Sequence, residues 1–151
     1  MSKFTQGTNT PKQGTGFYDT SKVFIGRNRF DNFQALFNIA IYADNVHEGT
    51  VFGRVASSGK VVPLSPLASD GSQIPIGILL GDIEIEAGTN YDGGVTLCVA
   101  GDVAEEKVLF LDGVTTLDTV VNNRRLRDRI GSDTVGIKLQ PGTELSELDN
   151  D

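Results

Sequence analysis

Short apolar runs separated by turn residues dominate the middle of the chain, residues 49–111. Each run is rich in Val and Ile and ends at Gly, Asp, Asn or Ser, which is the pattern of β-strands joined by turns. The strands expected from this pattern span residues 50–55, 60–64, 74–80, 82–86 and 95–99, and a further apolar run spans 108–111. No stretch between them is long enough for a crossover helix, which argues against a parallel βαβ architecture. The pattern therefore predicts an all-β unit.

Two more strands are expected outside this stretch, at residues 35–42 and 134–139. The first alternates apolar and polar positions with period two, so one of its faces is strongly apolar. Pro63 and Pro75 lie in or beside strand-like runs. Because proline donates no hydrogen bond to a sheet, these runs are expected to be edges or to be broken there. Residues 63–73 are expected to form a loop.

The period changes near the C-terminus, where residues 116–130 favour one α-helix. The apolar positions with helical spacing are Leu117, Val120, Val121, Leu126 and Ile130. Thr115 or Thr116 is the expected N-cap, and Gly131 the expected left-handed residue at the C-terminal end.

Charge and composition restrict the kind of protein. The formal net charge is −7 and the isoelectric point is near 4.6, which argues against a nucleic-acid-binding module. The four arginines between positions 124 and 129 form a basic cluster. It has two interpretations: a phosphate or nucleic-acid patch, or, more ordinarily, pairing with nearby acids or with an acidic partner subunit. The single cysteine, Cys98, excludes an internal disulfide, is expected to fill core space, and agrees with folding in a reducing cytosol.

The two ends differ from the middle in composition. Residues 1–16 are polar with interspersed Gly and Pro, so we expect a flexible arm over residues 1–20, followed by the β-rich domain over 21–140. Such an arm can fold onto a partner surface as an added strand, or it can be an untethered terminus. Residues 141–151 form an acidic tail. No secretory signal or membrane-spanning segment is expected.

Candidate catalytic or metal-binding chemistry is sparse. Asp82, Glu84 and Glu86 alternate with isoleucines, which suggests a Ca²⁺ site or a solvated outer face. Along an extended strand these side chains are about 6.5–7 Å apart, too far to gather one cation easily, so the outer face is the better interpretation. His47 is the one histidine and has no cysteine near it in sequence, so a surface role is expected. No local signature of an enzyme is found, and no cofactor, metal or catalytic residue is predicted.

The order of features in the central stretch resembles the head decoration proteins of tailed bacteriophages, the family of the lambda capsid-stabilising protein. The features that carry the resemblance are a first strand leading to Ser57-Ser58-Gly59-Lys60, a loop with Asp70-Gly71, the run Pro75-Ile76-Gly77-Ile78-Leu79, the stretch Gly101-Asp102-Val103, and a polar segment before the last strand. The likeness covers about residues 49–139. The 48 residues before it and the acidic tail after it lie outside the pattern.

The resemblance implies a small, mainly β domain, such as a β-barrel or β-tulip, that forms homotrimers. These would sit on the outside of the expanded phage head at three-fold and quasi-three-fold points and stabilise it against the pressure of packaged DNA. The partner would be the major capsid protein, with no nucleic acid or membrane involved. The arm residues expected to bind the capsid are Phe4, Pro11, Phe17 and Tyr18.

Two other functions remain open from the sequence. The first is a head fibre or a receptor- or glycan-binding surface protein, with Tyr91 and Asp92 in an exposed loop as its site. The second is a small β-fold hydrolase or metal enzyme that uses Asp82, Glu84 or His47. A convergent pocket of these side chains would favour the enzyme.

Overall fold

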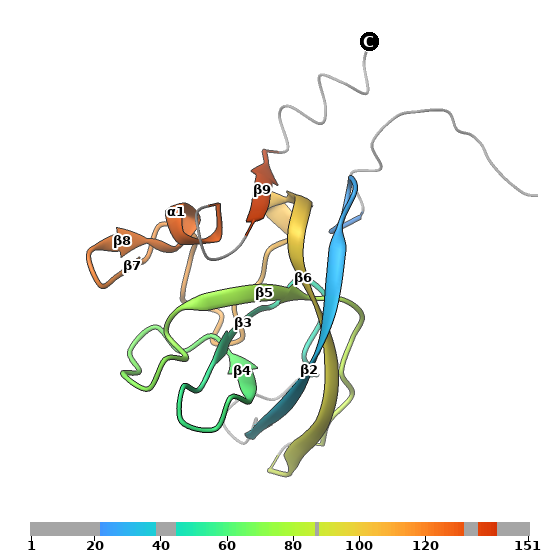
Figure 1. The fold of residues 1–151 in the computed structure, drawn as a ribbon, viewed down its shortest axis with the longest axis vertical. Coiled ribbons are helices and arrows are strands. Elements are labelled where there is room, and N and C mark those ends of the chain that lie inside the picture. The colour runs from blue at the N-terminus through green and yellow to red at the C-terminus, as the bar shows by residue number, and fades with distance from the viewer. Residues whose placement is uncertain (1–21, 39–44, 87, 132–135, 142–151) are drawn as a thin grey trace, which may run out of the picture.

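Five strands close into a barrel, and a sixth extends one side of it (Figure 1). The computed structural model describes residues 22–38, 45–86, 88–131 and 136–141. The barrel strands are β2 (Arg29–Asn38), β3 (Val51–Arg54), β4 (Val61–Pro63), β5 (Pro75–Leu79) and β6 (Asn90–Ala104). They pair in the order β2-β4-β3-β5-β6, and β2 closes the ring by pairing with β6. The last strand, β9 (Gly136–Gln140), runs parallel to the C-terminal end of β6. The expected mainly β, barrel-like fold is confirmed.

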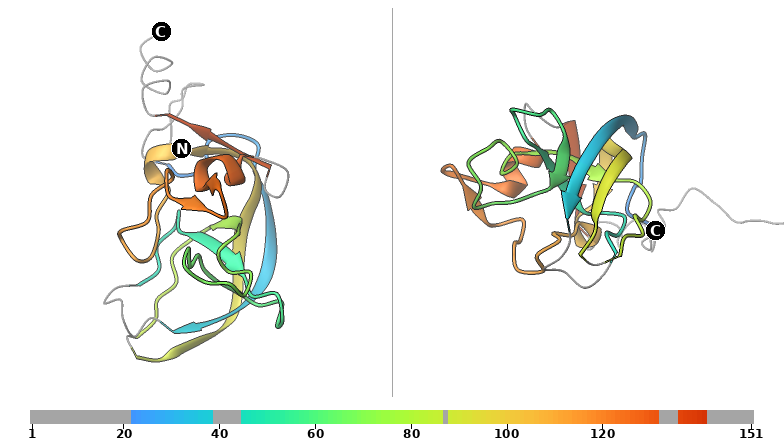
Figure 2. Two further views of the ribbon diagram at one scale, coloured as in Figure 1. Left: turned by 90° about the vertical axis from the view of Figure 1, so that its left-hand side faces the viewer. Right: turned by 90° about the horizontal axis from the view of Figure 1, so that it is seen from below.

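The long ribbon of β2 and β6 forms one wall of the barrel (Figure 2). Its inner face buries Ala35 and Phe37. On its outer face polar side chains hydrogen-bond across the two strands: Thr96 Oγ1 donates to Asn32 at 2.8 Å, and Asn38 donates to Asn90 at 2.9 Å. The strand predicted at 35–42 is confirmed as far as it is described, but it begins earlier, at Arg29. Residues 39–42 lie outside the described part.

Alternating apolar side chains fill the barrel interior, as the strand pattern predicts. Phe52, Leu79 and Leu97 are fully buried in one apolar cluster, whereas Ile78, which follows the opposite face of β5, is buried in a second cluster with Leu126 and Ile130. Cys98 is also fully buried and fills core space, as expected. Burial raises the pKa of its thiol, which outweighs the opposite effect of hydrogen bonds with Asn28 and Ala100.

Pro63 and Pro75 each lie at one end of a strand, but neither strand is an edge of the sheet. Pro63 is the last residue of β4, and Pro75 is the first of β5. Of the two predicted alternatives, a sheet edge or a strand broken at proline, the second is confirmed, since both strands stop at their proline while β4 lies between β2 and β3 and β5 between β3 and β6. Residues 64–74 form the expected loop, and the loop passes close to β3 at Gly53. A Cβ atom on Gly53 would lie 2.3 Å from the Ser72 carbonyl oxygen, so only glycine fits there.

Two expected strands are reduced to single bridges. Within residues 82–86 only Ile83 pairs, with Val46, and within 108–111 only Leu109 pairs, with Thr50. The cause at the first site is that side chains take the backbone donors. The Glu48 N–H donates to the Asp82 carboxylate at 2.7 Å, and the Ile85 N–H donates to the Asn45 side chain at 3.1 Å.

The expected helix is present but much shorter than its predicted range. It is α1 (Leu126–Ile130), preceded by a hairpin of β7 (Val120–Val121) and β8 (Arg124–Arg125). Asn122 and Asn123 form the turn with φ of 50° and 68°, a left-handed pair typical of tight hairpins. The predicted threonine N-cap is wrong, because Arg125 occupies that position, and Gly131 has a φ of −91° rather than a left-handed value. No helix among the described residues is long and apolar enough to cross a membrane.

Candidate functional site

Both described ends of the chain meet at the C-terminal end of β6. On one side, residues 23–25 run antiparallel to it: the Ala104 N–H donates to the Val23 carbonyl at 2.8 Å, and the Ile25 N–H donates to the Asp102 carbonyl at 3.1 Å. On the other side, β9 pairs with it, and Gln140 lies opposite Ala104. The N-terminal and C-terminal segments therefore leave the barrel from opposite sides of one buried residue, Ala104. Figure 1 shows both strands at the same end of the molecule.

The first residues of the described chain, which we call the arm root (residues 22–28), are firmly packed. Val23 and Ile25 are buried, and the Phe24 ring meets the Phe30 ring edge-on at 5.2 Å between centroids. The Asn28 side chain donates to the Asp102 carbonyl at 2.9 Å and accepts the Gly26 N–H at 3.2 Å. The arm root thus has both apolar anchors and backbone hydrogen bonds.

The predicted capsid-binding residues Phe4, Pro11, Phe17 and Tyr18 lie outside the described residues. The structure describes only the point from which their segment departs. The role of the arm root as an anchoring element is not among the features predicted from the sequence, although the apolar run at residues 23–25 is a signal for it.

A groove of about 620 Å³ runs beside β9 at the same end. Its lining includes Glu105, Arg127, Lys138, Leu139 and Pro141. Glu105 belongs to a short 3-10 turn, η1 (Glu105–Lys107), that follows β6 directly. Both charge signs are therefore present along the groove.

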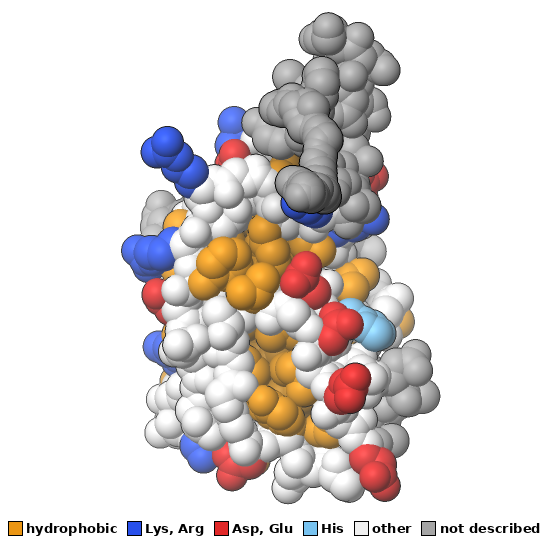
Figure 3. Space-filling view, turned by 90° about the vertical axis from the view of Figure 1, so that its right-hand side faces the viewer, with side chains coloured by type: hydrophobic (Ala, Val, Ile, Leu, Met, Phe, Trp, Pro, Cys, Tyr) orange, Lys and Arg blue, Asp and Glu red, His pale blue; other side chains and the backbone are white. Residues whose placement is uncertain are grey.

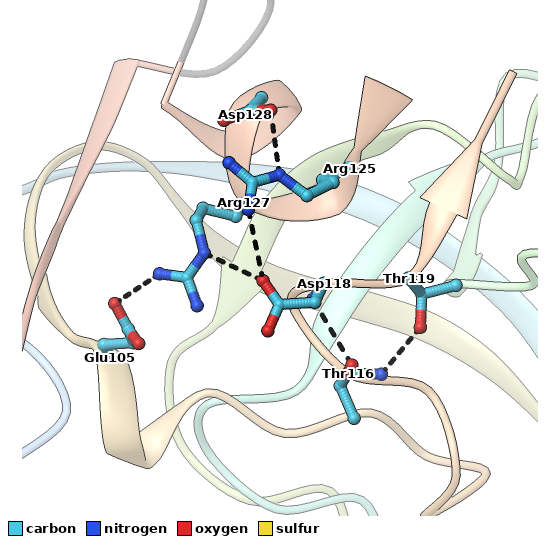
Figure 4. A network of polar contacts seen from close by, with 7 residues as sticks. All are labelled: Glu105, Thr116, Asp118, Thr119, Arg125, Arg127 and Asp128. Carbon is cyan, nitrogen blue, oxygen red and sulfur yellow. Dashed lines mark hydrogen bonds and ion pairs between the residues drawn. The ribbon is translucent and has the colours of Figure 1, made fainter. Parts of the chain in front are cut away.

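A network of ion pairs joins η1 to the segment that carries α1 (Figure 4). The Arg127 guanidinium donates to Glu105 at 2.6 Å and to Asp118 at 3.2 Å. These hydrogen bonds raise the pKa of Arg127 above its ordinary value. Arg125 contacts Asp118 at 3.7 Å and Asp128 at 3.3 Å. For these two arginines, the interpretation as partners of nearby acids is confirmed.

The acids at residues 82–86 lie on the outside of the barrel, as the preferred interpretation predicts. Asp82, Glu84 and Glu86 are exposed, while Ile83 between them is buried. His47 Nδ1 lies 3.8 Å from the Asp82 carboxylate, and both side chains are more than half exposed. Figure 3 shows the acids and the histidine along one side of this face. Among the described residues, no group of three or more His, Cys, Asp or Glu side chains is arranged to hold a metal ion.

Tyr91 and Asp92 do not form the expected exposed loop. Both belong to β6, where the Tyr91 hydroxyl donates to the Gly94 carbonyl at 2.7 Å and the ring packs on Phe37 at 5.5 Å. Asp92 accepts a hydrogen bond from Gln34 at 3.1 Å. These contacts use the two side chains to hold the β2–β6 ribbon together.

The fold and this end of the barrel define a small β-barrel protein whose terminal segments depart together from one anchored point. A comparison with family models identifies the family. The model of the bacteriophage lambda head decoration protein D matches residues 35–129, which is more than half of the 151 residues, and the chain belongs to this family. No curated protein matches the chain in a direct sequence comparison.

The family match confirms the family that the sequence resembles, but the matched residues, 35–129, differ from the expected range of about 49–139. It begins at Ala35, so part of β2 and the segment up to residue 48 lie inside the family pattern rather than outside it. The structure explains why, because β2 closes the barrel by pairing with β6. Membership gives the chain a structural role as a decoration protein on the exterior of the phage head.

Proposed function

We propose that the chain is a cementing protein of the expanded phage head. It is made in the host cytoplasm and binds the outer surface of the shell as a homotrimer at three-fold and quasi-three-fold points. There it joins neighbouring capsomers and stabilises the shell against the pressure of packaged DNA. The observation that carries the proposal is the anchored arm root beside Ala104, in a chain of the head decoration family.

The N-terminal arm is the proposed contact with the major capsid protein. Phe4, Pro11, Phe17 and Tyr18 are its proposed anchors, and the arm adds a strand to the capsid protein. Phe17 lies six residues before Val23 and Phe4 nineteen before it. At about 3.3–3.6 Å per extended residue, these anchors reach about 20 Å and 65 Å from the arm root. The near pair can contact the subunit beneath the barrel, and Phe4 can reach a neighbouring one.

The packing of the arm root supports a cementing role physically. A strand that leaves the barrel from backbone hydrogen bonds and two buried side chains transmits a pull to the whole barrel. Three such arms on one trimer raise the effective concentration of each arm near its site once the first is bound. Weak individual contacts therefore add to a strong attachment, and the net charge of −7 disfavours binding to DNA instead.

Deletion of residues 1–20 is the direct test. We expect the shortened protein to lose co-sedimentation with expanded shells while its mass in solution stays that of a trimer. The matched control is deletion of residues 142–151, which removes the other terminal segment at the same end and is expected to leave shell binding intact. Full decoration by the protein that lacks residues 1–20 would show that the arm is not the contact.

A further inference from the structure

The β7–β8 hairpin projects from the barrel on the side away from the β2–β6 ribbon (Figures 1 and 2). Each of its strands has only two residues, and such a two-stranded ribbon has marginal stability in water by itself. Val120, at the start of the hairpin, is 62% exposed although it is a large apolar residue. Covering this side chain with a partner would be favourable in proportion to the apolar area removed from water.

A second surface combines exposed apolar side chains with charges opposite to those of the hairpin. We call it the acid-rimmed patch: Leu80 and Leu109, with Glu48, Asp82 and Glu84 around them. The two leucines are 40% and 42% exposed. Its parts are neighbours, because Leu80, Asp82 and Glu84 line one shallow pocket. The Gly81 N–H donates to the Glu48 carboxylate at 2.7 Å, and the Leu109 N–H donates to the Gly49 carbonyl at 2.9 Å. Figure 3 shows acidic side chains and a histidine beside hydrophobic side chains on one face of the molecule.

The charges of the two surfaces are opposite. The hairpin presents Arg124 and Arg125 to solvent. Arg125 is already shared by Asp118 and Asp128, whereas the guanidinium of Arg124 donates to a neutral group, the Asp128 carbonyl, at 3.3 Å. Arg124 is thus the cation best placed to meet Glu84 or another carboxylate of the patch. Opposite charges around an apolar contact fix which surfaces meet and in which register.

We propose that the hairpin of one copy docks on the acid-rimmed patch of a second copy of this chain, with Val120 against Leu80 and Leu109 and with Arg124 beside Glu84. This inference rests on the proposed function in one respect, namely that the copies form closed trimers. A ring of three uses a heterologous contact, in which two different surfaces of each copy meet. The hairpin and the patch meet this requirement, since they lie on different sides of the barrel (Figures 2 and 3). Such a ring leaves the end at Ala104 available for the shell.

Charge reversal followed by restoration tests the contact. Sedimentation equilibrium of the full-length protein measures the dissociation constant of the trimer. We expect Arg124→Glu to weaken association at least tenfold and Val120→Asp to weaken it further. Adding Glu84→Arg to Arg124→Glu restores an opposite-charge pair, so the double variant is expected to regain most of the lost association. Circular dichroism and thermal melting show which variants stay folded.

Two controls separate this contact from general surface effects. Arg29→Glu reverses another exposed arginine on β2, and Leu67→Asp changes the fully exposed leucine in the loop near the hairpin; neither is expected to change the trimer. An unchanged trimer in Arg124→Glu and Val120→Asp, a double variant that is not restored, or a monomeric wild type overturns the proposal.

Co-sedimentation with expanded shells is measured for the same wild type and variants. If the wild type decorates shells but sedimentation equilibrium contradicts the expected trimer or the expected effects of the variants, the hairpin contact is wrong and the decoration role stands. If the wild type does not co-sediment with expanded shells, the proposed decoration role is wrong. Sedimentation equilibrium then still shows whether the hairpin and the patch meet between copies.

Discussion

The barrel and the segment from residue 112 to 131 are stabilised in different ways. The barrel buries large side chains from strands far apart in sequence, such as Phe52 and Leu97. The segment buries only Val121, Leu126 and Ile130, and leaves Val114 and Val120 exposed. Its shape depends on local polar contacts, including the Arg127 ion pairs and the two hydrogen bonds from Arg129 to the Val121 carbonyl. Apolar burial thus fixes the barrel and seats Val121, Leu126 and Ile130 on it, while side-chain polar groups hold the rest of the segment in shape.

The largest expected effect comes from removing an aromatic ring from the barrel. Phe52 is fully buried and meets Phe37 edge-on at 5.9 Å between centroids. Phe52→Ala leaves a cavity that the closed barrel cannot collapse to fill, so we expect a loss of about 3–5 kcal/mol in the free energy of unfolding. Urea denaturation at fixed protein concentration measures it, since assembly would add to apparent stability. Phe52→Leu is the control and should lose clearly less; a loss under about 1 kcal/mol for Phe52→Ala would contradict the view of the barrel as the main source of stability.

The barrel strands could be predicted from the sequence because each is a short run rich in Val and Ile that ends at turn residues. Residues 50–55, 60–64 and 74–80 each contain a strand of the structure, and residues 95–99 lie inside the longer strand β6. The start of β2 was missed because its outward residues are polar, and their partners, such as Thr96 for Asn32, lie about sixty residues away in the chain. Such pairing leaves no local periodicity to detect.

The predicted helix was too long because the buried residues of a β-hairpin and of a short helix together have helical spacing. Val121 points inward from a two-residue strand, whereas Leu126 and Ile130 point inward from a helix, and together they mimic a single helical face. The adjacent Asn122 and Asn123 were the available signal of a turn, since Asn tolerates left-handed backbone better than most residues. The convergence of both chain ends at Ala104 depends on long-range pairing and could not be predicted from local pattern.

An intermediate effect is expected at the ion pairs that connect the segment to the barrel. Arg127→Ala removes contacts to both Glu105 and Asp118, and we expect a loss of about 1 kcal/mol that shrinks at high salt. Arg29→Ala is the matched control, because it removes one exposed pair, with Asp31, from the barrel wall. Its expected loss is about 0–0.5 kcal/mol. Equal losses in both variants, measured by thermal melting at two salt concentrations, would mean that the network adds nothing beyond ordinary surface pairs.

The smallest effect is expected at Asp112, which organises the turn at the start of the segment. Burial alone would raise the pKa of its carboxyl, but hydrogen bonds from the Thr115 hydroxyl and N–H and from the Val114 N–H outweigh burial and hold the pKa below its ordinary value. A lowered pKa in the folded state means that the stabilisation is present above the unfolded pKa, about 3.9, and is lost as the pH falls through the folded value. Asp112→Asn should therefore cost under about 1 kcal/mol at pH 7 and make the acid side of the stability curve less steep.

Asp70 keeps part of that acid dependence in the variant. Hydrogen bonds from the Ser72 hydroxyl and N–H lower the pKa of its carboxyl in the same direction, so Asp112→Asn reduces the slope without removing it. Urea midpoints between pH 3 and 7 for the wild type, Asp112→Asn and Asp70→Asn separate the two contributions. If Asp112→Asn leaves the whole pH profile unchanged, the polar turn does not contribute to the segment's stability. The polar contribution to the segment would then rest on the ion pairs of Arg125 and Arg127 and on the hydrogen bonds of Arg129.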